Sequence, residues 1–167
     1  MKMIDGMLAE LEQESQTTRR VLERVPQAHL GWKPHPKSMS LGQLALHVAT
    51  VPGNVAELAA LDTIPEPPAF VQPEATSAAD LVPALADSVA RARTALGGFD
   101  DGRMMEMWRL QSGGRDLLAM PRAAFVRAIM LNHWYHHRGQ LLVYLRLLDQ
   151  PVPSVYGPSA DENPFAA

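Results

Sequence analysis

The sequence predicts an all-α protein with a four-helix bundle at its core. In four segments, apolar residues recur at the three- and four-residue spacing of an amphipathic helix, and these segments cover residues 4–25, 41–60, 78–96 and 121–148. The proline-rich segment 62–76 supplies one long crossover, and strand-like alternation is almost absent. At this chain length of 167 residues, we expect a single domain that spans residues 1–167.

Composition excludes several classes of protein. The net charge is −3 and no basic cluster is visible, so we expect no nucleic-acid partner. The chain has no cysteine, which excludes disulfides, thiolate metal ligands and a cysteine nucleophile. No run of about 18 apolar residues is present to span a membrane, and the N-terminus lacks the apolar core of a signal peptide. We therefore expect a cytoplasmic protein with no membrane partner.

The first predicted helix has an interruption in its apolar stripe. Leu11 and Thr18 belong to the stripe, but Glu14 and Ser15 stand between them where apolar residues are expected. Either something polar lies at that depth of the core, or this turn of the helix is partly exposed. Pro26 ends the helix because its ring cannot continue it.

The second predicted helix begins at a capping box. Ser40 is a favourable N-cap, and Gln43 three residues later completes the box. His47 lies on the same face as the apolar Leu44, so this helix presents a histidine from its core-facing side. A single core histidine is more often a hydrogen-bonded structural residue than a metal ligand. The proline and glycine at 52–53 are expected to bend the helix.

Residues 99–120 are open to two interpretations. Met104–Trp108 can form a strand, with Ser112–Gly114 as the turn to a second strand over Asp116–Leu118. Alternatively, the whole segment is one irregular loop that covers one end of the bundle. In both cases Pro121 opens the last helix.

The last predicted helix carries three of the six histidines, within the stretch NHWYHHRGQLLVYLRLL. His133 and His137 are one turn apart and therefore lie on one face, with His136 toward its edge. The same face is predicted to point into the core, and its other members are Val126, Ile129, Met130, Gln140, Tyr144 and Leu148. Two buried imidazoles need partners for their nitrogens, either a divalent cation or hydrogen bonds to neighbouring helices. Together with His47 they make three inward imidazoles, which favours the cation.

Several blocks of the sequence resemble the DinB/YfiT-like proteins, a superfamily of bacterial four-helix bundles with a metal site between the helices. SMSLGQLALHVA at Ser38–Ala49 contains the histidine of the family's second helix, and Pro121–Leu148 contains its H-x3-H-R-G-Q signature. The run TRRVLERVP at Thr18–Pro26 and the tail at Pro151–Glu162 extend the resemblance over essentially the whole chain. One departure is Asn54, where many relatives have an aromatic residue, and this difference is expected to alter the lining of the pocket.

The resemblance implies a metal site with three protein ligands, and these are His47, His133 and His137. It implies that Gln140 and Glu14 support the ligands through hydrogen bonds, and that His136 is a neighbour rather than a ligand. Arg138 is expected to tether the last helix through a salt bridge. Gly139 is expected to let another backbone approach closely.

Such a site implies chemistry, because three protein nitrogens leave an open position on a divalent ion. Zn²⁺, Ni²⁺, Mn²⁺ and Fe²⁺ all accept imidazole ligands. Relatives in the superfamily include thiol-dependent transferases and isomerases. The resemblance therefore implies an enzyme in which one divalent metal ion activates a low-molecular-weight thiol, or water, toward a small-molecule substrate.

The alternative is a non-catalytic stress protein that binds a metal or another ligand. A general base near the open metal position would separate the two functions. The candidates are Glu14, Asp161 and Glu162.

A homodimer is also expected, partly because dimers are common in the family. In addition, 47% of the residues are hydrophobic, and Met104, Met105, Met107 and Trp108 cluster in one segment. Exposed apolar surface of this kind is expected to pack against a second copy of the chain.

Overall fold

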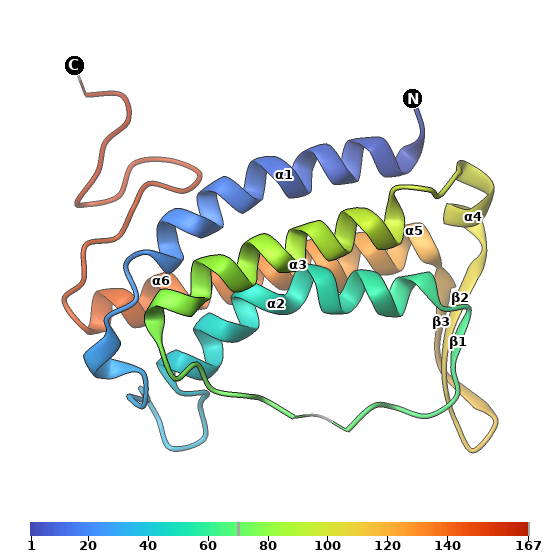
Figure 1. Ribbon diagram of the computed structural model, residues 1–167, viewed down its shortest axis with the longest axis horizontal. Coiled ribbons are helices and arrows are strands. Elements are labelled where there is room, and N and C mark those ends of the chain that lie inside the picture. The colour runs from blue at the N-terminus through green and yellow to red at the C-terminus, as the bar shows by residue number, and fades with distance from the viewer. Residues whose placement is uncertain (70, 167) are drawn as a thin grey trace.

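Four long helical segments make up about half of the structure, a computed structural model that describes residues 1–69 and 71–166 (Figure 1). They are α1 (Met3–Leu22), α2 (Leu41–Ala60), α3 (Leu81–Leu96) and an unbroken run of α5 (Arg122–Phe125), η3 (Val126–Asn132) and α6 (His133–Leu147). α3 packs against α1 and α2, and α6 packs against α2 and α1. The helical predictions for these four segments are confirmed, with small differences at their ends.

The N-terminus of α2 is capped as predicted. The Gln43 amide N–H donates to the Ser40 hydroxyl at 3.1 Å, and the Ser40 N–H donates to the Gln43 side chain at 2.9 Å. This is the predicted capping box, which satisfies two of the backbone donors that a helix start leaves without partners. A short 3₁₀ helix, η2 (Ala78–Asp80), precedes α3 and occupies the start of the predicted third helix.

The predicted all-α class is confirmed only in part, because a small three-stranded sheet lies at one end of the helices (Figure 1). β2 (Met107–Ser112) and β3 (Arg115–Pro121) form an antiparallel hairpin, and β1 (Thr63–Ile64) pairs with β2 in parallel. The hairpin interpretation is therefore confirmed over that of an irregular loop. Its turn is Gly113–Gly114, with φ of +55° and +75°, which glycine adopts without a steric penalty.

The hairpin begins later than predicted, because Met104 and Met105 belong to the short helix α4 (Asp101–Met105). Met104 is fully buried, whereas Met105 and Met107 expose 57% and 44% of their surface. Only part of the predicted methionine cluster is therefore available to a partner.

A fully buried arginine joins the sheet end of the molecule to α2. The Arg122 Nε donates to the Ala59 carbonyl at 2.6 Å, and one Nη donates to the Leu61 carbonyl at 3.0 Å and to Asp62 at 2.9 Å. Carbonyls at a helix C-terminus lack intrahelical partners, so a cation there is favourable. Arg122 thus fixes the start of the last helix against the end of α2.

The last helix changes register at η3, which is π-helical. After η3, the buried face of α6 contains Trp134, Arg138, Leu141 and Leu145. Continued backwards as an α-helix, this face would contain residue 127, but the buried side chain is Val126. A π turn holds one residue more than an α turn, so it brings both halves of the helix into the core with their own apolar faces.

This register change corrects the predicted stripe. Periodicity from Val126 at α-helical spacing placed His133 and His137 in the middle of the core-facing side. The π turn rotates α6, so both histidines lie half-buried at the edge of that side, and Gln140 is exposed.

The C-terminal tail runs back along the ends of α1 and α6 (Figure 1). Arg20 of α1 pairs with Glu162, and Arg146 of α6 pairs with Asp161. The Arg20 guanidinium also donates to the Ser154 carbonyl at 3.2 Å. None of the helices in the described ranges is both long and apolar enough to cross a membrane.

Candidate metal centre

α2 and α6 are joined by a hydrogen bond beside the histidines. The proline at position 52 lies inside α2 and has no N–H, so the Val48 carbonyl four residues earlier lacks its helical donor. The indole Nε1 of Trp134 donates to this carbonyl at 2.7 Å. Val48 and Trp134 each follow a histidine, His47 and His133, in the sequence. The bond therefore sets the spacing of the two helices at the histidines.

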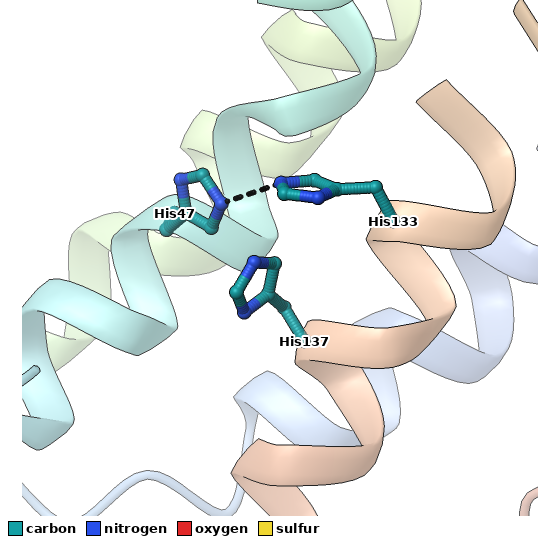
Figure 2. A group of neighbouring side chains, drawn as sticks. All are labelled: His47, His133 and His137. Carbon is teal, nitrogen blue, oxygen red and sulfur yellow. Dashed lines mark hydrogen bonds between the residues drawn. The ribbon is translucent and has the colours of Figure 1, made fainter. Parts of the chain in front are cut away.

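Three imidazoles converge between the two helices (Figure 2). His47 comes from α2, and His133 and His137 come from successive turns of α6. The Nε2 atoms of His47 and His133 lie 3.1 Å apart, and one nitrogen from each of the three rings lies within 4.8 Å of the others. The three rings are half-buried.

The electrostatics of the group keep it uncharged near neutral pH. Burial, followed by the charges that His137 and His133 would carry, lowers the pKa of His47 to about 4. Burial is also the main cause that lowers the pKa of His133 and of His137. Neutral imidazoles have free lone pairs, and these are the form that binds a metal ion.

The distance between the His47 and His133 nitrogens fits two ligands that share one metal ion. Two nitrogens that are each about 2.1 Å from one ion, at right or tetrahedral angles, are about 3.0–3.4 Å apart. The separation of 3.1 Å between His47 and His133 falls in this range. The three histidines can therefore hold a divalent ion. In the described ranges, the alternative of hydrogen bonds to a neighbouring helix is met only by the contact between the His47 and His133 rings themselves (Figure 2).

One partner outside the group orients the third ring. The Nδ1 of His137 lies 2.8 Å from the side-chain oxygen of Gln140, one turn later on α6. An oxygen acceptor requires the proton on Nδ1, which leaves the Nε2 lone pair of His137 available. His136 is exposed and its ring lies beside that of His137, with centroids 5.0 Å apart, but it is not part of the convergent group.

Glu14 lies in a different polar cluster, around Arg138 on the buried face of α6. Its carboxylate pairs with the buried Arg138 guanidinium at 2.6 Å and accepts a hydrogen bond from the Tyr156 hydroxyl at 3.0 Å. Arg138 also donates to the Thr18 hydroxyl at 3.0 Å. The predicted salt bridge of Arg138 is thus confirmed, and the polar interruption in α1 is explained by it. None of the hydrogen bonds of Glu14 in the described residues reaches a histidine.

Two other expectations resolve differently. Asp161 and Glu162, the remaining candidates for a general base, are engaged by Arg146 and Arg20 and hold the tail in place. Gly139 does not admit a neighbouring backbone, because a Cβ atom built there would meet nothing within 4 Å. The glycine that allows a close approach is Gly53, where a Cβ would lie 2.8 Å from the Ser88 carbonyl oxygen of α3.

A separate groove of about 280 Å³ lies between α1 and α3. Val82, Leu85 and Val89 line it, and the Glu12–Arg93 ion pair, at 3.0 Å, lies at its edge. It contains none of the three histidines, so it does not belong to the candidate metal centre.

Comparison with known proteins places this geometry in a family. The family model described as the DinB superfamily matches residues 10–141, which include all three convergent histidines. The chain belongs to the DinB superfamily. The uncharacterized protein YrdA of Bacillus subtilis strain 168 is 27% identical over 164 residues, which are 95% of this chain and 91% of YrdA.

Solved structures of DinB-like proteins share the fold. A DinB-like protein of Bacillus cereus ATCC 10987 superimposes with a TM-score of 0.71 at 24% identity, covering 92% of this chain and 97% of the other. The DinB-like protein YjoA of Bacillus subtilis gives a TM-score of 0.67 at 18% identity, covering 90% and 96%. At this identity the likeness establishes the DinB-like fold of this chain.

Sequence reasoning missed two residues of this DinB-superfamily protein, one beside the candidate metal centre and one in the cluster of Glu14 and Arg138. Trp134 was not singled out, although a proline inside α2 signals a carbonyl in need of a donor. Tyr156 was not singled out either, and its contact with Glu14 and Arg138 depends on the path of the tail. No local pattern in the sequence reveals that path.

Proposed function

We propose that this DinB-superfamily protein binds one divalent metal ion through His47, His133 and His137 and uses it as an enzyme. The observation that carries the proposal is the convergence of three neutral imidazoles, each offering a nitrogen within 4.8 Å of the others. No fourth histidine or carboxylate joins this group in the described ranges. Structural zinc sites are normally closed by four protein ligands, so an open site favours chemistry.

When bound there, a divalent ion supplies Lewis acidity that lowers the pKa of a low-molecular-weight thiol or of water. The residues of this chain orient the donors. Gln140 keeps the proton of His137 on Nδ1, and the Trp134–Val48 bond holds the two helices at their distance. We propose a thiol transferase as the first reaction class and a hydrolase as the second, both acting on a small-molecule substrate.

The three imidazole nitrogens restrict the choice of metal ion only in part. Imidazole nitrogens suit zinc, nickel and iron, and they also accept manganese. The chain has no cysteine that would select a softer ion. We therefore propose Zn²⁺, Ni²⁺, Mn²⁺ or Fe²⁺ as the resident ion.

One observation favours a second candidate, a protein that binds a metal or ligand without turnover. The three carboxylates proposed as general bases are each paired with an arginine: Glu14 with Arg138, Asp161 with Arg146 and Glu162 with Arg20. A carboxylate held in an ion pair is a weaker base, because the pair favours its charged form. A thiol loses its proton more readily than water, so thiol transfer needs a protein base less than hydrolysis does. If the protein is an enzyme, the ion pairs therefore favour a thiol transferase over a hydrolase.

The test is a reaction screen on protein purified without a histidine tag or nickel column. The protein is loaded with each of the four ions in turn and mixed with cysteine, glutathione or no thiol, together with 1-chloro-2,4-dinitrobenzene as electrophile or p-nitrophenyl acetate as ester. The proposal predicts turnover that requires both metal and His137, so a His137→Ala variant treated identically is the control. Metal binding without turnover of either substrate class would establish the binding protein instead.

A further inference from the structure

One of the three tryptophans differs from the others in its surroundings. Trp108 and Trp134 are buried, and their indole N–H groups donate to the carbonyls of Leu58 and Val48. Trp32 is half-buried, and its indole N–H has no hydrogen-bond partner among the residues that the structure describes. No buried side-chain nitrogen in the described residues lacks a partner, so this N–H is open to solvent, and Trp32 offers both an apolar ring and an accessible donor.

Trp32 is placed by α6 at the same seam as the histidines. Its ring packs edge-to-face against Tyr144, with centroids 5.7 Å apart and an interplanar angle of 86°. Tyr144 follows His137 by two helical turns, on the same face of α6 and about 10 Å further along its axis. The two rings, called the aromatic wall below, therefore lie within the length of a small molecule from the metal centre.

Hydrogen bonds hold the two segments that carry the aromatic wall in place before any ligand arrives. The backbone N–H of Leu41 donates to the Trp32 carbonyl at 2.8 Å, and the backbone N–H of Trp32 donates to the His29 carbonyl at 2.9 Å. The Tyr144 hydroxyl donates to the Met39 carbonyl at 3.3 Å. The two backbone bonds hold the loop to itself and to the start of α2, and the Tyr144 bond ties this loop to the end of α6, the end at the left of Figure 1. A surface already held in place loses little conformational entropy on binding.

The polar groups of the aromatic wall indicate the ligand. It offers one indole N–H donor and the lone pairs of a phenol oxygen, and neither ring is hydrogen-bonded to a charged side chain in the described part of the chain. We propose that Trp32 and Tyr144 bind an uncharged aromatic group that carries a hydrogen-bond acceptor, in the molecule whose other end is held at the three histidines. This inference rests on the proposed function for the nature of that other end.

The test uses two thiols that differ only in a ring. N-(2-mercaptoethyl)benzamide carries an aromatic amide, and N-(2-mercaptoethyl)acetamide carries a methyl group in its place. Their affinities for Co²⁺-loaded protein are measured from the sulfur-to-cobalt charge-transfer band. We expect the benzamide to bind about three- to tenfold more tightly. Trp32→Ala should remove this preference and leave the affinity for the acetamide within about twofold.

A second readout does not depend on the metal. In ¹⁵N-labelled metal-free protein, the indole signals number three, and Trp32→Phe identifies the signal of Trp32 by its loss. N-ethylbenzamide, which has no thiol, is titrated to millimolar concentration. The aromatic wall predicts a saturable shift of the Trp32 signal, with the signals of Trp108 and Trp134 unmoved.

The outcomes separate the two proposals. If neither thiol binds the cobalt protein but the Trp32 signal shifts, the aromatic wall stands and the thiol function fails. If both thiols bind with equal affinity, or if Trp32→Ala keeps the preference for the benzamide, the aromatic wall is overturned. An unmoved Trp32 signal overturns it as well. Tyr144→Phe, which removes only one hydroxyl, should keep the ring preference.

Discussion

The indole nitrogen of Trp134 lies 2.7 Å from the carbonyl oxygen of Val48 and takes the place of the backbone donor that the proline at position 52 lacks. This bond joins the two helices that carry the histidines, one residue after His47 and one residue after His133. The proline in α2 leaves a carbonyl without a donor, and the tryptophan in α6 supplies that donor next to the candidate metal centre.

Replacing Trp134 by Phe should weaken both the fold and the metal centre. The variant keeps an aromatic ring but leaves the buried Val48 carbonyl without a donor, which costs about 1–3 kcal/mol of unfolding free energy. Trp108→Phe is the matched control, because it removes a similar bond, to the Leu58 carbonyl at 3.0 Å, near the sheet. Urea unfolding and zinc titration are measured on both. Equal zinc affinity in the two variants would show that the Trp134 bond does not position the histidines.

Glu14→Gln should destabilise the protein without removing its metal. The substitution leaves the buried Arg138 cation without its anionic partner, which costs about 3–5 kcal/mol when one member of a buried pair is removed. Urea unfolding monitored by circular dichroism measures this loss. The outcome that contradicts a structural role is a stable Glu14→Gln protein that has lost its zinc or its activity. That result would instead support the role expected from the sequence, in which Glu14 supports the metal ligands or acts as a general base.

The metal-free protein should lose stability on acidification because of His47. Its folded pKa is about 4, below the value of about 6.5 expected when unfolded, so the unfolded state binds the extra proton first. The unfolding free energy should therefore fall as the pH drops from about 6.5 to about 4 and show no further contribution from His47 below that. Urea unfolding at successive pH values tests this, with His47→Ala as the reference. An identical slope in both proteins would exclude the effect.

The prediction of a homodimer is still to be tested. Met105, Met107 and Leu117 expose 57%, 44% and 58% of their surfaces near the hairpin, whereas Met104 and Trp108 are buried. Light scattering at micromolar concentration measures the mass directly. A mass of twice the 18.3 kDa chain is expected, and a monomer would contradict the prediction. Met105→Lys should then weaken the dimer if this surface is the interface.

The long helices and the presence of histidines on two core-facing helices were predictable because both depend on local spacing, whereas the meeting of His47 with His133 and His137 was expected from the family resemblance. Apolar periodicity found the long helical segments, and the i, i+4 pair of His133 and His137 follows from one turn of helix. The inward phase of His47 came from its position after Leu44. These features need no knowledge of how distant segments meet.

The remaining features could not be predicted, since they depend on tertiary contacts. β1 pairs with β2 across more than forty residues, as in the register Thr63 with Arg109, and two residues carry too little periodicity to mark a strand. The π turn of η3 lies between Val126 and Trp134, which are both buried; a strict α-helix would set them about 80° apart, and the additional residue of the π turn changes the phase of α6 relative to that spacing. This is why the histidines lie at the edge of the buried face instead of its middle.

The most direct test of the central claim is the metal content of tag-free protein, compared among the wild type, His137→Ala and His136→Ala. The matched pair removes neighbouring imidazoles of which only His137 belongs to the convergent group. Elemental analysis after dialysis should find about one divalent ion per chain in the wild type and in His136→Ala and almost none in His137→Ala, with equal helical circular dichroism in all three. Loss of the metal in His136→Ala together with its retention in His137→Ala would contradict the assignment of the ligands.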